Sequence, residues 1–400
     1  MSDPHPPAYR WVVLAVGVVA QAAFSAVSTG LPALAPALRE HYDLSIAHVG
    51  VALAAVGGGM IVTMLGWGAL ADRIGERLVM SIGLTGAAAA MLVATRVGGS
   101  GALVGTLVVA GCFGSSVNAA SGRAVAGWFR PAERGLAMGV RQSALPLGGA
   151  LAAATLPTIA GAENAPRALA VLAGFCAVGA LTAAVGMRDP APEPAAAAGP
   201  SADPHPLRDV RIWRLTAASF TLVVPQLALL SFVALYLHDE RGLSPVAAGA
   251  VLAAAQITGV VCRIAVGLGS DRLGTRLRLL RALVLAFAGA LVAGVLLLSA
   301  PVPVTATALA VAVVLALCWN GLAFLTVAET ASPSRRGVAL GLQNTAVAIG
   351  GTVAPVGFGL TVAGAGWTTA FALLPLCPVL ALAVLTPLAR AERTLPAARV

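Results

Sequence analysis

Three arginines lie inside long apolar stretches of the sequence: Arg123, Arg141 and Arg263. If these stretches are membrane helices, each mid-helix charge costs roughly 2.5–3.5 kcal/mol to insert, which makes each arginine a candidate functional group. Arg123 lies near the end of its stretch, from which a long side chain can reach lipid phosphates instead. Arg263 is the deepest, because it precedes the loop residue Asp271 by eight residues, or ~12 Å along a helix. Fixed positive charges of this kind favour a bound anion.

Arg263 shares a helix face with two slim or polar residues. Gln256, Gly259 and Arg263 stand at positions i, i+3 and i+7, so they line up on one side of a helix. A face that contacts lipid would be apolar. Two interpretations remain open: Arg263 contacts an anionic solute, or it is an arginine at a gate or helix interface.

Other polar residues inside apolar stretches are candidates for solute contact at helical spacing. They are Gln21, Ser25, Ser28 and Thr29 on one face, Asn118, Gln226, Asn320, and the equivalent triplets Arg141-Gln142-Ser143 and Gln343-Asn344-Thr345. The alternative for each is hydrogen bonding between helices, worth about 0.6 kcal/mol. No aspartate or glutamate lies near the middle of these stretches. The five cysteines have no metal-ligand spacing and are interpreted as packing residues: Cys112, Cys176, Cys262, Cys318 and Cys377.

A charged loop motif occurs twice, 199 residues apart. The two copies are Gly68-Ala-Leu-Ala-Asp72-Arg73-Ile-Gly75-Glu-Arg77 and Gly267-Leu-Gly-Ser-Asp271-Arg272-Leu-Gly274-Thr-Arg276. The second glycine of each motif permits backbone angles that other residues resist. The aspartate can cap a helix N-terminus or pair with arginine. We expect a conformational latch rather than solute contact, the alternative being a tight turn with solvated charges. Glu329 is expected to pair with Arg272 or Arg276, although it could also carry a proton.

The elements that position these residues follow from the composition. Hydrophobic residues make up 58% of the 400 residues and charged residues 10%, whereas a soluble domain has about a quarter charged residues. In lipid, apolar side chains can face outward while each helix satisfies its own backbone. We therefore predict an all-α membrane protein with twelve transmembrane helices, each long enough to cross ~30 Å of hydrocarbon. The predicted spans are 11–35, 47–69, 79–97, 102–128, 135–160, 167–187, 212–238, 245–269, 277–300, 304–329, 337–362 and 367–388.

The basic residues indicate the orientation of these spans. All 25 are arginine, and with a cytoplasmic N-terminus the inner segments would hold eighteen of them and the outer segments four. This asymmetry predicts that both termini are cytoplasmic, because inner loops carry the excess of arginine and lysine. The charge is scattered over short loops, which argues against a nucleic-acid partner.

The chain divides into two similar halves around a linker. Residues 189–210 are rich in proline and alanine and have no hydrophobic period, so we predict a cytoplasmic linker between six-helix bundles at 1–188 and 211–400. A second matching pair supports the duplication. It is Arg134-Gly135-Leu-Ala-Met-Gly-Val-Arg141-Gln142 with Arg336-Gly337-Val-Ala-Leu-Gly-Leu-Gln343-Asn344, 202 residues later.

Twelve helices arranged as six plus six, with the loop motif repeated, resemble the major facilitator superfamily over nearly the whole chain. The resemblance implies two pseudo-symmetric bundles, related by an axis along the membrane normal, around a site exposed alternately to each side. It implies that helices one, four, seven and ten line the cavity. It also implies that Asp72 docks at the start of helix eleven and Asp271 near helix five.

A narrower resemblance concerns helix eight. Arg263, followed by Gly267 and the loop acid, is similar to helix eight of the monocarboxylate transporters and the oxalate–formate exchanger, where this arginine meets the substrate carboxylate. Gly259 stands where monocarboxylate transporters carry an aspartate. That departure puts their proton-coupling route in doubt.

These features predict a secondary transporter of a small organic anion, such as a carboxylate, in the cell membrane. The expected partners are a small-molecule substrate and the lipid bilayer, with a co-transported or exchanged ion left open, and the expected state is a monomer. No cofactor, metal, nucleic acid or enzymatic activity is expected. One alternative is a drug or metabolite efflux antiporter, which helix five resembles weakly at Ala144-Leu-Pro146-Leu-Gly148-Gly149. A more distant alternative is a membrane sensor that does not transport.

Overall fold

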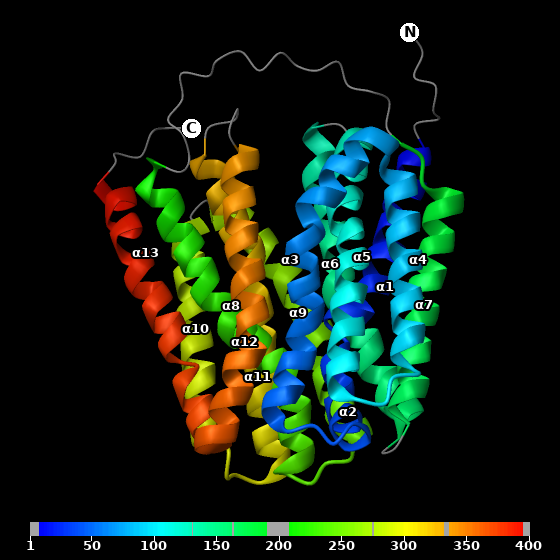
Figure 1. The fold of residues 1–400 in the computed structure, drawn as a ribbon. Coiled ribbons are helices and arrows are strands. Elements are labelled where there is room, and N and C mark those ends of the chain that lie inside the picture. Colours follow the sequence, from blue (N-terminus) through cyan, green and yellow to red (C-terminus); the bar gives the residue numbers. More distant parts are fainter. Residues whose placement is uncertain are drawn as a thin grey trace. The chain divides into compact units, whose positions relative to one another are not determined.

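A computed structural model describes residues 8–394 except 130, 162–163, 190–207, 274–275 and 332–335. The regular structure of these residues is helical (Figure 1). The helices are α1 (Tyr9–Ser28), the 3₁₀ helix η1 (Leu31–Leu34), α2 (Ala35–His41), α3 (Ile46–Ile74), α4 (Glu76–Ala94), α5 (Ser100–Trp128), α6 (Pro131–Ala160), α7 (Ala165–Gly186), α8 (Val210–Asp239), α9 (Pro245–Leu273), α10 (Arg276–Leu296), α11 (Val302–Thr330), α12 (Arg336–Leu373) and α13 (Leu376–Thr394).

The apolar stretches account for the length of these helices. Within the described residues, eleven segments are long and apolar enough to cross a membrane, and a shorter apolar segment, Leu376–Leu388, lies in α13. The prediction of an all-α membrane protein is confirmed. A polar residue places the start of α3: the Ser45 side chain accepts a hydrogen bond from the His48 backbone N–H at 3.3 Å and so caps this helix.

Three predicted boundaries differ from the structure. The first predicted span, 11–35, is divided into α1, η1 and α2, with Pro32 and Pro36 at the starts of the two short helices. The predicted span 367–388 is not one helix, because a turn at Leu374 and Pro375 separates α12 from α13. Gly366, with a φ of 82°, interrupts α12 in the gap between the predicted spans 337–362 and 367–388. The start of α6 is Pro131 rather than residue 135, which places Arg141 nearly three turns into its helix.

The contacts divide the chain into two compact units. The first comprises residues 1–196 together with Ala234–Ala253, and the second comprises residues 197–233 together with 254–400. Within the first unit, α3 and α5 are packed backbone to backbone: a Cβ added at Gly59 or at Gly111 would lie 2.0 Å from a carbonyl oxygen of the other helix. Small residues allow such approach between membrane helices. The predicted domain limits at 188 and 211 stay a prediction.

Candidate functional site

Arg141 lies in the interior of the first unit, surrounded by polar side chains from three helices. It projects from α6 and is 6% exposed. Its Nη1 donates hydrogen bonds to Gln21 Oε1 of α1 at 3.2 Å and to Ser121 Oγ of α5 at 3.1 Å. Its Nη2 donates to Gln142 Oε1 at 3.0 Å. The sequence singled out Gln21 and the neighbouring pair Arg141 and Gln142, and the structure brings all three into one cluster with Ser121.

Close packing of α1 on α6 creates this cluster. A Cβ added at Gly148 would lie 2.3 Å from the carbonyl oxygen of Ala22, so only glycine allows the approach. The Ser25 hydroxyl then donates to the carbonyl oxygen of Leu145 at 2.7 Å. Ser25 therefore ties two helices together, which is the alternative that the sequence left open for this face of helix one.

The Arg141 guanidinium has only neutral acceptors among the described residues. A guanidinium carries five N–H donors, and the Nε of Arg141 is buried without a hydrogen-bond partner in the described structure. Nε and Nη2 form the side-on edge of the group, whose parallel N–H bonds match the two oxygens of a carboxylate. The cluster thus presents a positive charge with unfilled donor capacity.

The second unit has hydrogen-bonded pairs of neutral residues at sequence positions that correspond to Asn118 and Arg141. Asn320 Nδ2 of α11 donates to Gln226 Oε1 of α8 at 3.0 Å. Gln343 of α12, the sequence equivalent of Arg141, donates from Nε2 to Ser219 Oγ of α8 at 2.7 Å. The Gln343 Oε1 atom is buried without a hydrogen-bond partner in the described structure. Two helix interfaces of this unit are therefore hydrogen-bonded without any charge.

The remaining predicted contact residues, Asn344 and Asn118, are less buried than Arg141 and Gln343. Asn344 is exposed on α12, where its Nδ2 donates to the Leu340 carbonyl oxygen one turn away at 3.0 Å. Asn118 is half-buried on α5. Their role in solute contact stays a prediction.

Arg263 lies at the interface of α9 and α11. Its Nε donates to the carbonyl oxygen of Leu317 at 3.0 Å. Gly259 faces the same leucine: a Cβ added at Gly259 would lie 2.6 Å from Leu317 Cδ1. Gln256 is 1% exposed, and its Nε2 is buried without a hydrogen-bond partner in the described structure. The structure therefore shows the interface contact that the sequence offered as an alternative, while contact with a solute stays a prediction.

The first loop motif contacts the C-terminal end of α7 and the residues that follow it. Gly75 has a φ of 85° and a ψ of 162°, a conformation open to glycine alone, and it precedes α4 without a side chain that could cap it. Asp189 supplies the cap, since its Oδ1 accepts from the Arg77 backbone N–H at 2.9 Å. Arg77 Nε donates to the carbonyl oxygen of Ala184 at 2.7 Å, while Arg73 is exposed.

Sequence reasoning missed the role of Asp189, which it placed in the linker. An acid directly after an arginine at the end of an apolar stretch was the available signal. The first motif is thus a capped helix start within one unit, and its action as a latch stays a prediction.

The second loop motif contains one predicted ion pair. Arg276 Nε of α10 lies 2.8 Å from Glu329 Oε2 of α11, which confirms the pairing expected for Glu329. The side chains of Asp72, Asp271 and Arg272 and the position of Gly274 lie outside the described residues.

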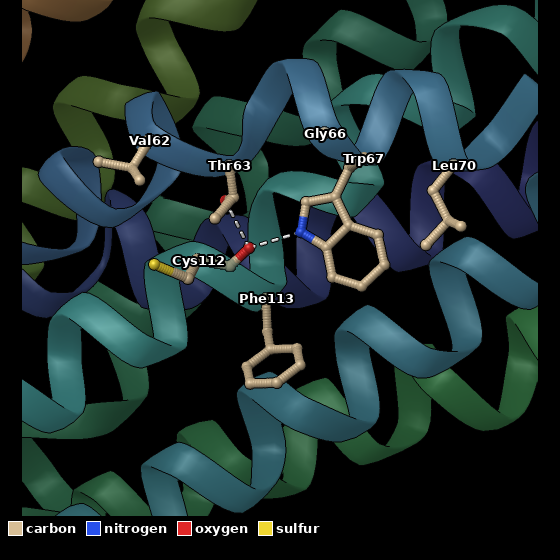
Figure 2. Close-up of a pocket in the computed structure, with 7 residues that line it drawn as sticks. All are labelled: Val62, Thr63, Gly66, Trp67, Leu70, Cys112 and Phe113. Carbon is tan, nitrogen blue, oxygen red and sulfur yellow. Dashed lines mark hydrogen bonds between the residues drawn. The ribbon is translucent and has the colours of Figure 1, made fainter.

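One cavity of the first unit contains no predicted site residue. It has a volume of about 400 Å³ and lies between α3 and α5 (Figure 2). Its lining residues are Val62, Thr63, Gly66, Trp67, Leu70, Cys112 and Phe113. Figure 2 shows the Thr63 hydroxyl and the Trp67 indole N–H pointing at the Cys112 carbonyl oxygen, to which they donate at 2.7 and 2.6 Å. The lining carries no charge, and two aromatic side chains in an apolar stretch gave no sequence signal for a cavity.

Comparison with known proteins identifies the family. Residues 14–355 match the sequence profile of the Major Facilitator Superfamily. The chain belongs to the major facilitator superfamily. It is 32% identical, over 385 residues, to an uncharacterised transporter of this superfamily that occurs in two strains of Mycobacterium tuberculosis. The match covers 95% of this chain and 85% of the mycobacterial protein.

Solved structures agree at the level of the fold. A bacterial homologue of the human lysosomal transporter Spinster, inward-facing and occupied, aligns with a TM-score of 0.81 at 14% identity and covers 96% of this chain and 98% of that one. A mutant of the nucleoside transporter NupG aligns with a TM-score of 0.75 at 14% identity, covering 94% of this chain and 99% of its own. The major facilitator fold is therefore confirmed. The narrower resemblance to monocarboxylate and oxalate–formate transporters is not supported by these relatives.

Proposed function

We propose that this major facilitator protein carries a small organic anion, such as a carboxylate, across the cell membrane by alternating access. The observation that supports the proposal is the buried Arg141 guanidinium, which has neutral partners and an unpartnered Nε. A carboxylate at the Nε–Nη2 edge would supply both a counter-charge and the missing acceptor. Arg263 adds a second positive charge within the spans.

The proposed roles of the other groups follow from their bonds. Gln21 and Gln142 hold the Arg141 guanidinium in place, so they orient the charge. The amide pair of Gln226 and Asn320 offers neutral donors and acceptors for the uncharged part of a solute. Asn118, Gln256, Gln343 and Asn344 are further proposed contacts, and the two loop motifs with Glu329 form the proposed latch.

The proposed orientation has both termini in the cytoplasm. The arginine excess of the inner segments supports it, and labelling of single introduced cysteines from each side of the membrane would test it. We also propose a monomer. Measuring solute flux under imposed ion gradients would show whether an ion is exchanged or co-transported.

Uptake into proteoliposomes tests the proposed cargo. Radiolabelled carboxylates, inorganic anions and cationic dyes are offered to vesicles that contain the wild type, Arg141→Gln or Arg167→Gln. Arg167 is an exposed arginine at the start of α7, so its replacement is a matched control for the loss of one charge. We expect carboxylate uptake in the wild type and in Arg167→Gln and none in Arg141→Gln. Full uptake by a correctly folded Arg141→Gln protein would refute the assignment.

Efflux of a lipophilic compound is a second candidate, favoured by the uncharged cavity beside Trp67 and Phe113. Aromatic and apolar linings suit flat, hydrophobic ligands. The two candidates differ in thermal-shift experiments, because a ligand at a hundred times its Kd stabilises by about 2.7 kcal/mol. Stabilisation by lipophilic dyes that is lost in Trp67→Ala, without stabilisation by carboxylates, would favour efflux.

A further inference from the structure

α9 and α11 are held in register by two contacts at Leu317. The leucine side chain fills the space beside Gly259, where an added Cβ would lie 3.1 Å from Leu317 Cβ. One turn further along α9, the Nε of Arg263 donates to the Leu317 carbonyl oxygen at 3.0 Å. Residues next to Arg263 and Leu317 in the chain are therefore brought to the same level of the two helices.

Both of those neighbours are cysteines. Cys262 precedes Arg263, and Cys318 follows Leu317. The Cys318 thiol donates a hydrogen bond to the carbonyl oxygen of Val314 in its own helix at 3.1 Å, and it lies close enough to the Cys262 thiol and the Arg263 guanidinium to interact electrostatically with both. Cys318 is 2% exposed, whereas Cys262 is half-buried. The sequence offered packing as the role of each cysteine, but it could not show that two thiols on different helices meet beside an arginine.

We propose that Cys262 and Cys318 form a reversible disulfide that ties α9 to α11 beside Arg263. The oxidant is a small disulfide compound. The Cys262 thiolate attacks one of its sulfurs, which forms a mixed disulfide and releases one thiol. The Cys318 thiolate then attacks the sulfur of Cys262 and releases the second thiol. The two electrons that the cysteines lose reduce the small disulfide, and their two protons go to the released thiols.

The order of the steps follows from exposure and charge. Cys262 is the accessible thiol, so it meets the oxidant first. Cys318 is buried beside Cys262, so it is placed to attack the mixed disulfide rather than to meet the oxidant first. Disulfides that form in a reducing compartment are mostly transient and redox-sensing, which suits a bond between two helices that are already in contact. The bond would keep Arg263 against Leu317.

Thiol counting with 2,2′-dithiodipyridine, a small apolar disulfide, tests the proposal. Cys112, Cys176 and Cys377 are replaced by alanine in the full-length chain, which is held in lipid nanodiscs. For each protein molecule, we expect the reagent to release two molecules of pyridinethione. The protein should lose the mass of two hydrogen atoms and should return to its starting mass with dithiothreitol. In the matched control Cys318→Ser, the accessible Cys262 thiol should keep one pyridylthio group, whereas in Cys262→Ser the buried Cys318 thiol should stay largely unmodified.

Two results would overturn the disulfide. One is a protein that keeps a pyridyl group on each of the two thiols. The other is a folded protein that does not react although the same protein unfolded in dodecyl sulfate does.

Uptake in vesicles tests the tie between helices, and this readout alone depends on the proposed function. Oxidation should stop uptake reversibly only when both cysteines are present, and unchanged flux through the fully oxidised protein would contradict the tie.

Discussion

Replacing Gly75 by alanine should break the contact between the start of α4 and Asp189, which follows α7. The glycine conformation, φ 85° and ψ 162°, costs another residue about 1–3 kcal/mol. The new Cβ would also lie 2.4 Å from Asp189 Oδ2, so the carboxylate would have to leave its position. That movement breaks the hydrogen bond from the Arg77 backbone N–H, a bond to a charged group worth about 1.5–3 kcal/mol. The free energy of unfolding should fall by about 2.5–6 kcal/mol in total.

A double-mutant cycle separates the two contributions. Asp189→Ala alone should cost only the cap, about 1.5–3 kcal/mol, and Gly75→Ala in the Asp189→Ala background should cost only the backbone strain. The assay is equilibrium unfolding in detergent followed by circular dichroism. Gly242→Ala is a matched control, because Gly242 has a φ of 69° and no atom lies within 4 Å of its added Cβ. If the two single changes simply add in the double variant, the proposed contact between Gly75 and Asp189 has no energetic weight.

Three further predictions concern the charged groups. Arg141→Lys keeps the charge but lacks the side-on edge, so carboxylate affinity measured by titration calorimetry should fall roughly 10–100-fold, and wild-type affinity would contradict the role of the edge. The side-chain hydrogen bond from Arg211 holds the pKa of Asp209 below its usual value. The stability that Asp209 contributes is therefore fully present above its unfolded pKa of about 3.9 and is lost as the pH falls through the lower folded pKa. The difference in melting temperature between the wild type and Asp209→Asn should thus shrink at low pH, and a difference independent of pH would oppose this account. Glu329→Gln removes the pair with Arg276, but the Glu329 side chain is 47% exposed, so stability should change by less than ~1 kcal/mol. A latch role requires altered uptake at unchanged binding affinity, and equal uptake by the variant would exclude that role.

The helices could be predicted from the sequence because lipid imposes a simple requirement. A spanning helix needs about 20 apolar residues, and that signal is local. The break at Gly366 falls in the gap between the predicted spans 337–362 and 367–388, but the turn at Leu374 and Pro375 was missed because the apolar stretch continues across it. The pairing of Arg276 with Glu329 was predictable because loop motifs and positive-inside asymmetry place both residues at one membrane edge.

The partners of Arg141 could not be predicted from the sequence. Gln21 lies far from Arg141 in the chain and meets it because Gly148 lets α1 approach α6, whereas Ser121 meets it across the interface of α5 and α6. Composition identified each polar residue but not which residues share a helix interface. The same limit applies to Cys262 and Cys318, whose contact depends on the register of α9 against α11.

An aspartate near each end of the predicted linker accepts a hydrogen bond from the first turn of a helix. Asp189 caps α4 in the first unit, and Asp209 caps α8, with its Oδ1 accepting from the Arg211 backbone N–H at 2.8 Å. A protease cut between these two residues would leave each carboxylate attached to the helices it stabilises. The transporter should therefore tolerate expression as two separate polypeptides that assemble without a covalent bridge.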